Sequence, residues 1–164
     1  MDDFGIILDS EELYLDESLS TPGQIAYLGI GFCFQINGSL FPCPGWVDSV
    51  YPVITMWAEH ILRNADSKTA KFELYFFEGS YKINVQKNGN NVTLKAVECK
   101  HEDIVKHEQS GAYATLFNNV YDTICKLLRL IYIDSRFAGK AGSIERSLSY
   151  YKNKMGVYMR NRHD

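Results

Sequence analysis

Residues 71–97 decide the fold, and they read KFELYFFEGSYKINVQKNGNNVTLKAV. Large apolar residues alternate with polar ones along three short runs, and this two-residue period is typical of strands with one buried face. Gly79 separates the first two runs, and Asn88-Gly89 separates the last two, so both breaks contain residues that tolerate tight turns. The stretch therefore predicts a three-stranded antiparallel meander whose apolar face needs a cover.

Segments on both sides of the meander supply that cover. Residues 24–36 alternate in the same way and predict a further strand, in which Gly29 and Gly31 indicate a bend or a closely packed neighbouring backbone. Residues 49–63 and 111–134 carry apolar side chains at three- and four-residue spacings, which predicts two core helices.

Polar residues mark the expected beginnings of these helices. Ser110 is expected to cap the second helix, and Asp48 or Ser49 the first. Residues 98–108 are charged and have little periodicity, so we expect a polar loop there. The expected architecture is a single α+β domain over residues 1–164, with an antiparallel sheet (71–97 plus 24–36) packed against helices near 49–63 and 111–134 and with a C-terminal helix.

Charge is distributed unevenly along the chain. Residues 1–62 contain nine acids and no Lys or Arg, whereas the rest of the chain holds all 17 basic residues against 11 acids. This asymmetry is hidden in a net charge of −3 at pH 7. It indicates an acidic surface suited to a basic partner if the acids gather in space, and only a diffuse field if they scatter.

The two ends of the chain have opposite character. Residues 1–20 place two short apolar runs among acids, which is typical of an edge strand protected from unwanted pairing; a disordered acidic arm is the alternative. Residues 139–164 combine six Lys and Arg residues with tyrosines and predict a basic terminal helix, a composition that also suits phosphate contact and base stacking. Because the acidic first third would repel a polyanion, we expect no direct contact with nucleic acid.

Export and membrane signals are weak throughout the sequence. The first residues have no basic leader, and no apolar run approaches the roughly 18 residues that cross a bilayer. The four cysteines show no CxxC spacing. We therefore expect a cytoplasmic protein without membrane contact, present as a monomer or as a weak homodimer paired through an uncovered edge of the first strands.

Catalytic and metal-binding patterns are also weak. Cys99, His101 and His107 form one metal-like grouping, but structural zinc uses two close ligand pairs and this grouping has one. Cys99 or Cys43 could pair with a histidine as a nucleophile, yet no activating signature flanks either residue. We expect no enzyme activity, no metal and no cofactor; the alternatives are a small-molecule-binding or regulatory α+β module and, less favoured, a Cys/His enzyme.

The order of aromatic and glycine residues over 25–131 carries a family resemblance. A strand ending in GFCFQING (31–38) leads to Phe41-x-x-x-Gly45-Trp46, and a helix containing Val53-x-x-x-Trp57 follows. The pattern FELYFFEG-x-Y-x-I-x-V (72–85) and a long apolar helix complete the series. This order resembles small immunity proteins of bacterial polymorphic-toxin systems, including those of contact-dependent growth inhibition (CDI).

The resemblance implies a cytosolic, non-enzymatic protein that binds and neutralises a cognate toxin, and it carries over no catalytic residue. Many such toxins are nucleases with substrate grooves lined by Lys and Arg. An acidic inhibitor can occupy such a groove as a phosphate mimic, with fast and salt-sensitive association. The expected electrostatic contacts are Asp9, Glu11, Glu12, Asp16, Glu17, Asp48 and Glu59, with Tyr14 and Tyr27 as aromatic anchors.

Overall fold

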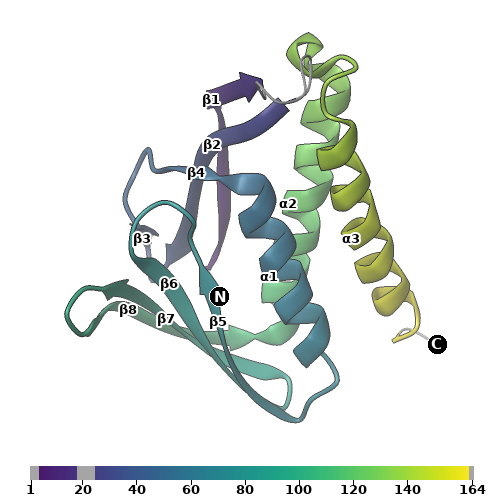
Figure 1. Cartoon of the computed structure of the whole chain (residues 1–164). Coiled ribbons are helices and arrows are strands. Elements are labelled where there is room, and N and C mark those ends of the chain that lie inside the picture. Colours follow the sequence, from purple (N-terminus) through teal and green to yellow (C-terminus); the bar gives the residue numbers. More distant parts are fainter. Residues whose placement is uncertain (1–3, 18–24, 163–164) are drawn as a thin grey trace.

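The computed structural model describes residues 4–17 and 25–162 (Figure 1). Within these residues the chain forms two antiparallel sheets and three α-helices, which confirms the α+β class. The elements follow in the order β1 (Gly5–Glu17), β2 (Ile25–Ile36), β3 (Ser39–Phe41), β4 (Val47–Ser49), α1 (Val50–Asn64), β5 (Thr69–Tyr75), β6 (Tyr81–Asn88), β7 (Asn91–Cys99), β8 (Asp103–Ala112), α2 (Tyr113–Ile133), the 3-10 turn η1 (Ser135–Phe137) and α3 (Gly142–Arg160).

Sheet A consists of β1 to β4 and is built on β2, the strand expected at 24–36. β1 pairs with one edge of β2, and β3 and β4 pair with separate parts of the other edge. β1 therefore forms an edge strand, as the acidic N-terminal segment predicted. The turn from β2 to β3 uses Asn37 and Gly38, both with positive φ, which is the geometry of a two-residue hairpin.

Sheet B consists of β5 to β8 in sequence order, and its first three strands confirm the predicted meander. Gly79 and Gly89 lie in its two turns with positive φ angles of 71° and 60°. The fourth strand is a difference from the sequence prediction, because residues 103–112 were expected to lie in a loop and a helix cap. Ser110 lies in β8 and exchanges a hydrogen bond with Thr93 at 3.0 Å, so it does not cap α2.

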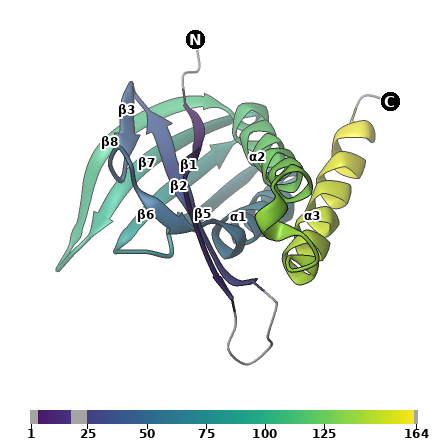
Figure 2. The ribbon, with the colours of Figure 1, turned by 90° about the horizontal axis from the view of Figure 1, so that it is seen from above.

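The predicted strands belong to two sheets and not to one. Sheets A and B meet around α1, and Figure 2 shows β1 and β2 running in a different direction from the strands of sheet B. Trp57 of α1 fills the junction, with ring-centroid distances of 5.3 Å to Phe32 of β2 and 5.4 Å to Phe76 after β5. Its indole N–H donates to the carbonyl oxygen of Tyr75 at 2.8 Å. The helix thus joins two sheets through one aromatic cluster.

The remaining helices form the other side of the core. α2 packs against β1 and α1, and α3 packs against α1 and α2 as the helix farthest from the sheets (Figure 1). α3 buries Ile144, Leu148 and Met155 along one stripe, and its outward side carries the basic residues. This arrangement confirms the predicted C-terminal helix, and none of the described helices covers the outer face of either sheet.

Candidate functional site

The outer face of sheet A gathers most of the acids that the sequence singled out. In the register of β1 and β2, Asp9 is opposite Gly31 and Asp16 is opposite Tyr27, and alternate residues of paired strands share a face. The opposite, inner face of these strands is apolar and buried. We call the exposed side chains Asp9, Glu11, Glu12, Tyr14 and Asp16, together with the half-buried Tyr27, the acidic face.

A three-residue bulge interrupts β1 in the middle of the acidic face. β1 advances from Asp9 to Leu13 while β2 advances by one residue, so residues 10–12 have no partner on β2. The Oδ1 atom of Asp9 accepts a hydrogen bond from the backbone N–H of Glu11 at 3.0 Å, which stabilises the turn locally. The bulge carries two adjacent glutamates away from the regular strand pairing.

Gly31 explains how the bulge fits over β2. A β-carbon at this position would lie 2.7 Å from Cβ of Asp9, 3.0 Å from the carbonyl oxygen of Asp9 and 3.3 Å from Cβ of Glu12. The first distance is shorter than real β-carbons show and the other two are tight, so any larger residue at this strand position would push the bulge away. The predicted close packing of a neighbouring backbone on this glycine is confirmed.

Two tyrosines lie beyond the bulge, at the end of the acidic face where β1 ends and β2 begins. Tyr14 and Tyr27 pack edge to face with ring centroids 5.9 Å apart, and Tyr14 is 60% exposed. A β-carbon at Gly29 would lie 2.8 Å from the ring of Tyr27, so this ring lies directly over the glycine. The arrangement provides an aromatic surface beside the carboxylates.

The prediction that Asp48 is an electrostatic contact on the surface is wrong, because the residue is 0% exposed. Burial raises the pKa of its carboxyl above the ordinary value, and the hydrogen bonds that it accepts oppose this effect. The carboxylate joins the beginning of α1 to the loop after β5. It accepts from the backbone N–H groups of Ser49, Phe77 and Glu78 at 2.7, 3.1 and 3.2 Å, and from the indole N–H of Trp46 at 3.0 Å.

Two further candidates do not add to the acidic face. Glu59 lies apart from it, and the side chain of Glu17 is outside the described residues. Glu59 projects from α1 and forms ion pairs with Arg63 at 3.4 Å and with Lys154 of α3 at 4.0 Å, so its charge is compensated within the helical layer. Glu17 ends β1 opposite Ile25, and its side chain lies outside the described part of the chain, as do residues 1–3 and 18–20 of the acidic segment.

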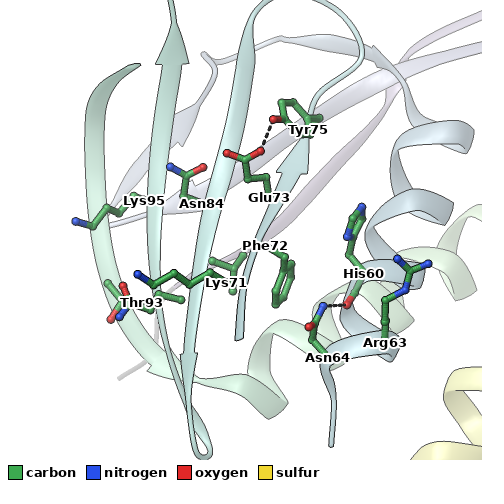
Figure 3. A pocket seen from close by; sticks show the side chains of 12 residues that line it. His60, Arg63, Asn64, Lys71, Phe72, Glu73, Tyr75, Asn84, Thr93 and Lys95 are labelled. Carbon is green, nitrogen blue, oxygen red and sulfur yellow. Dashed lines mark hydrogen bonds between the residues drawn. The ribbon is translucent and has the colours of Figure 1, made fainter. Parts of the chain in front are cut away.

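A hollow of about 680 Å³ lies where the outer face of sheet B meets α1 (Figure 3). The ring of His60 stacks on Phe72 with centroids 6.3 Å apart and forms the wall on the helix side. Asn84 lies on the sheet side, and its Oδ1 atom is buried without a hydrogen-bond partner among the described residues. The charged residues that line the hollow are Arg63, Lys71, Glu73 and Lys95.

Lys82 is held between two carboxylates beside this hollow. Its ammonium group lies 2.8 Å from Oε1 of Glu73 and 2.8 Å from Oδ2 of Asp103, and the residue is 8% exposed. These contacts raise the pKa of Lys82 and lower the pKa values of both carboxyls. A lysine that stays protonated is a structural cation, because a base or nucleophile needs a lowered pKa.

Replacing Lys82 with Met is expected to raise the pKa of Glu73 toward its ordinary value of 4.5, because the hydrogen bond from Lys82 is the main cause of the lowering. The hydrogen bond from Tyr75 persists and keeps part of the effect. A ¹³C NMR titration of the carboxyl groups in the original and the variant protein measures the pKa of Glu73. Glu98, whose pKa is lowered by Lys106 and Lys100, is the internal control and is expected to stay unchanged.

The lowered pKa of Glu73 makes the stability of the protein depend on pH. Since folding lowers the pKa of Glu73, its stabilisation is present above the unfolded-state pKa and is lost as pH falls through the folded-state value. A Lys82→Met protein in which Glu73 titrates as in the original chain would refute the assigned cause, and a shift of both Glu73 and Glu98 would indicate a wider structural change.

Cys99 and His107, two members of the predicted metal-like grouping, lie apart on neighbouring strands. Burial raises the pKa of the Cys99 thiol, which disfavours the reactive thiolate. His107 is opposite Ala96, three residues along β7 from Cys99, which corresponds to about 10 Å of strand. No three His, Cys, Asp or Glu side chains form a possible ligand set in residues 4–17 and 25–162.

No family model matches the chain, and no curated protein or solved structure matches it either. The described helices include none that is long and apolar enough to cross a membrane. The fold and its surfaces define an α+β protein with two antiparallel sheets, a helical layer and an acidic, tyrosine-bearing sheet face.

Proposed function

We propose that the protein is an immunity protein that binds a cognate basic toxin domain and neutralises it by stoichiometric contact. The acidic face carries this proposal, because exposed Asp9, Tyr14 and Asp16 share one face of β1 and β2, and the exposed Glu11 and Glu12 lie in the bulge between them. The toxin is proposed to be of the nuclease type. In this role the protein acts in the cytoplasm as a monomer or weak homodimer, without catalysis and without direct contact to nucleic acid or membrane.

The carboxylates of the acidic face differ from most other acids of the protein in their surroundings. Glu59, Glu73, Glu98, Asp103 and Glu108 each form an ion pair with a Lys or Arg. Within the described residues, none of the four carboxylates of the acidic face does so. Their negative field is therefore uncompensated, and such a field accelerates encounter with a basic partner in a salt-dependent way.

Tyr14 supplies the proposed anchor. Tyrosine is enriched among the residues that dominate binding energy, because it buries a rigid ring and retains a polar hydroxyl group. The contact of Tyr14 with Tyr27 restricts the ring before binding and so lowers the entropy that binding costs. The acids and the tyrosine pair together provide long-range attraction and a local apolar contact.

The proposal is tested by capture of partners from the cells that produce the protein. The tagged chain is washed at low and then at high salt, and proteins retained at one-to-one stoichiometry are identified by mass spectrometry. We expect one basic toxin domain, retained at low salt and weakened at high salt. Neutralisation is then measured as loss of the activity of the purified toxin at equimolar protein.

The double variant Glu11→Lys/Glu12→Lys is expected to weaken toxin binding by about tenfold or more, because it places positive charge where the basic partner contacts the bulge. Its thermal midpoint is expected to stay unchanged, since Asp9 and its bond to the Glu11 N–H are retained. The measurement is calorimetric titration with purified toxin at low salt.

Glu102→Lys/Asp122→Lys is the matched control, because it changes net charge equally at two exposed residues outside the acidic face. Equal weakening in both variants would point to net charge alone, and full affinity in the first variant would exclude this face. If no protein is captured and small molecules raise the thermal midpoint instead, the second candidate function, a small-molecule-binding module, takes precedence. The unpaired Asn84 oxygen in the sheet B hollow favours that candidate.

A further inference from the structure

A separate cavity of about 380 Å³ lies where the beginning of α2, the end of α3 and the turn between β6 and β7 meet. These three parts lie on the same side of the molecule, remote in sequence from the acidic face (Figure 1). The cavity combines cationic groups with aromatic walls. The residues that define its chemistry are Lys87, Asn90, Tyr113, Phe117, Tyr158 and Arg162.

Lys87 is a buried cation without a carboxylate partner. The residue is 6% exposed, and its ammonium group donates to the carbonyl oxygen of Ser67 and lies 4.9 Å from the centroid of the Tyr113 ring. No carboxylate among the described residues lies within 4 Å of its nitrogen, in contrast to Lys82 with two such partners. A buried charge without a counter-ion is unfavourable, so this position favours an added anion.

Arg162 adds a second positive charge at the same cavity. Its guanidinium lies 5.2 Å from the centroid of the Tyr158 ring and 3.8 Å from Oδ1 of Asp66. Asp66 also accepts a hydrogen bond from the Tyr158 hydroxyl at 2.9 Å, and its side chain is mostly exposed. The direct contacts of this acid are therefore with Arg162 and Tyr158, and it acts on Lys87 only at longer range. Burial, followed by repulsion from Arg162, lowers the pKa of Lys87, and the attraction of Asp66 offsets only part of this effect.

Aromatic rings form the apolar part of the cavity. Phe117 and Tyr158 stack with centroids 5.2 Å apart and an interplanar angle of 28°, and the Tyr113 ring lies beside Lys87. Tyr113 is fixed on its other side, because its hydroxyl donates to the carbonyl oxygen of Ile61. Rings held in this way offer flat contact surfaces to a planar group. The first turn of α2 holds no acid that would compete with an anion for Lys87.

We propose that this cavity binds a small organic anion with a planar apolar body, namely an aromatic carboxylate or phosphate ester. The anionic group lies between Lys87 and Arg162, and the planar body lies against the rings of Phe117 and Tyr158. Charge neutralisation of the buried Lys87, with the exposed Arg162 beside it, supplies the specificity for anions, and ring contact supplies the preference for an aromatic ligand.

The test is calorimetric titration of the full chain with phenyl phosphate and benzoate, and with benzyl alcohol and inorganic phosphate as controls. We expect at least one aromatic anion to bind, and both controls to bind about tenfold more weakly or worse. Binding of phenyl phosphate alone identifies the phosphate class, and binding of benzoate alone identifies the carboxylate class. If neither aromatic anion binds, or if benzyl alcohol binds equally well, the proposal is wrong.

Lys87→Met is the decisive variant, because it keeps an unbranched side chain of similar length and removes the charge. We expect it to lower the affinity for the bound aromatic anion about tenfold, whereas Lys71→Met in the sheet B hollow leaves the affinity unchanged. Arg162→Gln, at a more exposed position, provides an independent reading with a loss of about threefold or more, even if Lys87→Met folds poorly. Full affinity in Lys87→Met or Arg162→Gln would overturn the assigned site. The Glu11→Lys/Glu12→Lys protein is expected to bind the anion normally, which separates this site from toxin binding.

Discussion

Replacing Trp57 with Ala is expected to lower the free energy of unfolding by about 3–5 kcal/mol, the range for removal of a large aromatic side chain from a core. Trp57 is 0% exposed and contacts rings from both sheets, namely Phe32 and Phe34 of β2 and Phe76 after β5. The substitution leaves a cavity at the place where the sheets meet. It also removes the donor to the carbonyl oxygen of Tyr75.

Urea unfolding at equilibrium measures this effect through the midpoint and the slope of the transition. Ile133→Ala at the end of α2 is the control, because Ile133 is 74% exposed and its loss is expected to change stability by less than about 0.5 kcal/mol. If Trp57→Ala unfolds at nearly the original midpoint, the aromatic cluster does not join the two sheets as described. If sheets A and B of the original chain unfold in separate transitions, Trp57 does not join them as described.

Replacing Asp48 with Ala is expected to destabilise the protein by about 3 kcal/mol or more, because buried donors without an acceptor each cost about 1–3 kcal/mol. The carboxylate accepts from three backbone N–H groups and from the Trp46 indole. Asp48→Asn keeps one acceptor oxygen for the backbone groups and is expected to lose about 1 kcal/mol at neutral pH. Chemical denaturation of all three proteins measures the difference.

The pH dependence distinguishes burial of the charge from loss of hydrogen bonds. Burial raises the folded-state pKa of Asp48 above its ordinary value of 3.8, so the folded state binds the proton more tightly. The contribution of Asp48 to stability therefore falls as pH rises from the unfolded-state pKa through the folded-state pKa, and it is constant above both. We expect the deficit of Asp48→Asn to be larger at acidic than at neutral pH. The reverse trend would mean that the hydrogen bonds outweigh burial and lower the pKa.

Apolar periodicity predicted those elements whose two faces have different surroundings. The strands of the meander, the strand at 24–36 and the helices near 49–63 and 111–134 each have one buried side, and the alternation or spacing of apolar residues reports it. β8 was missed because it lacks such a difference between its two faces. Most of its side chains are exposed on both faces, so only its pairing with β7 makes it a strand.

The candidate site was predictable where it depends on neighbours in sequence and unpredictable where it depends on distant contacts. The break between the apolar runs Phe4–Leu8 and Leu13–Leu15 is the sequence signal of the bulge in β1. Asp48 resembles any surface acid in the sequence, because its burial depends on N–H groups of Phe77 and Glu78 about thirty residues later. The only local signal was Trp46, two residues before it, which provides one donor.

The bulge in β1 also limits how other chains can approach the edge of sheet A. An open edge strand is a template on which a second backbone can add, and a row of such additions produces fibrils. Here the bulge divides the edge into two short pieces, and Asn119 occupies the first by accepting from the N–H of Ile6 at 3.3 Å and reaching the carbonyl oxygen of Phe4 at 3.5 Å. The bulge and Asn119 therefore disfavour continuous strand addition along this edge, including the edge-paired homodimer expected from the sequence.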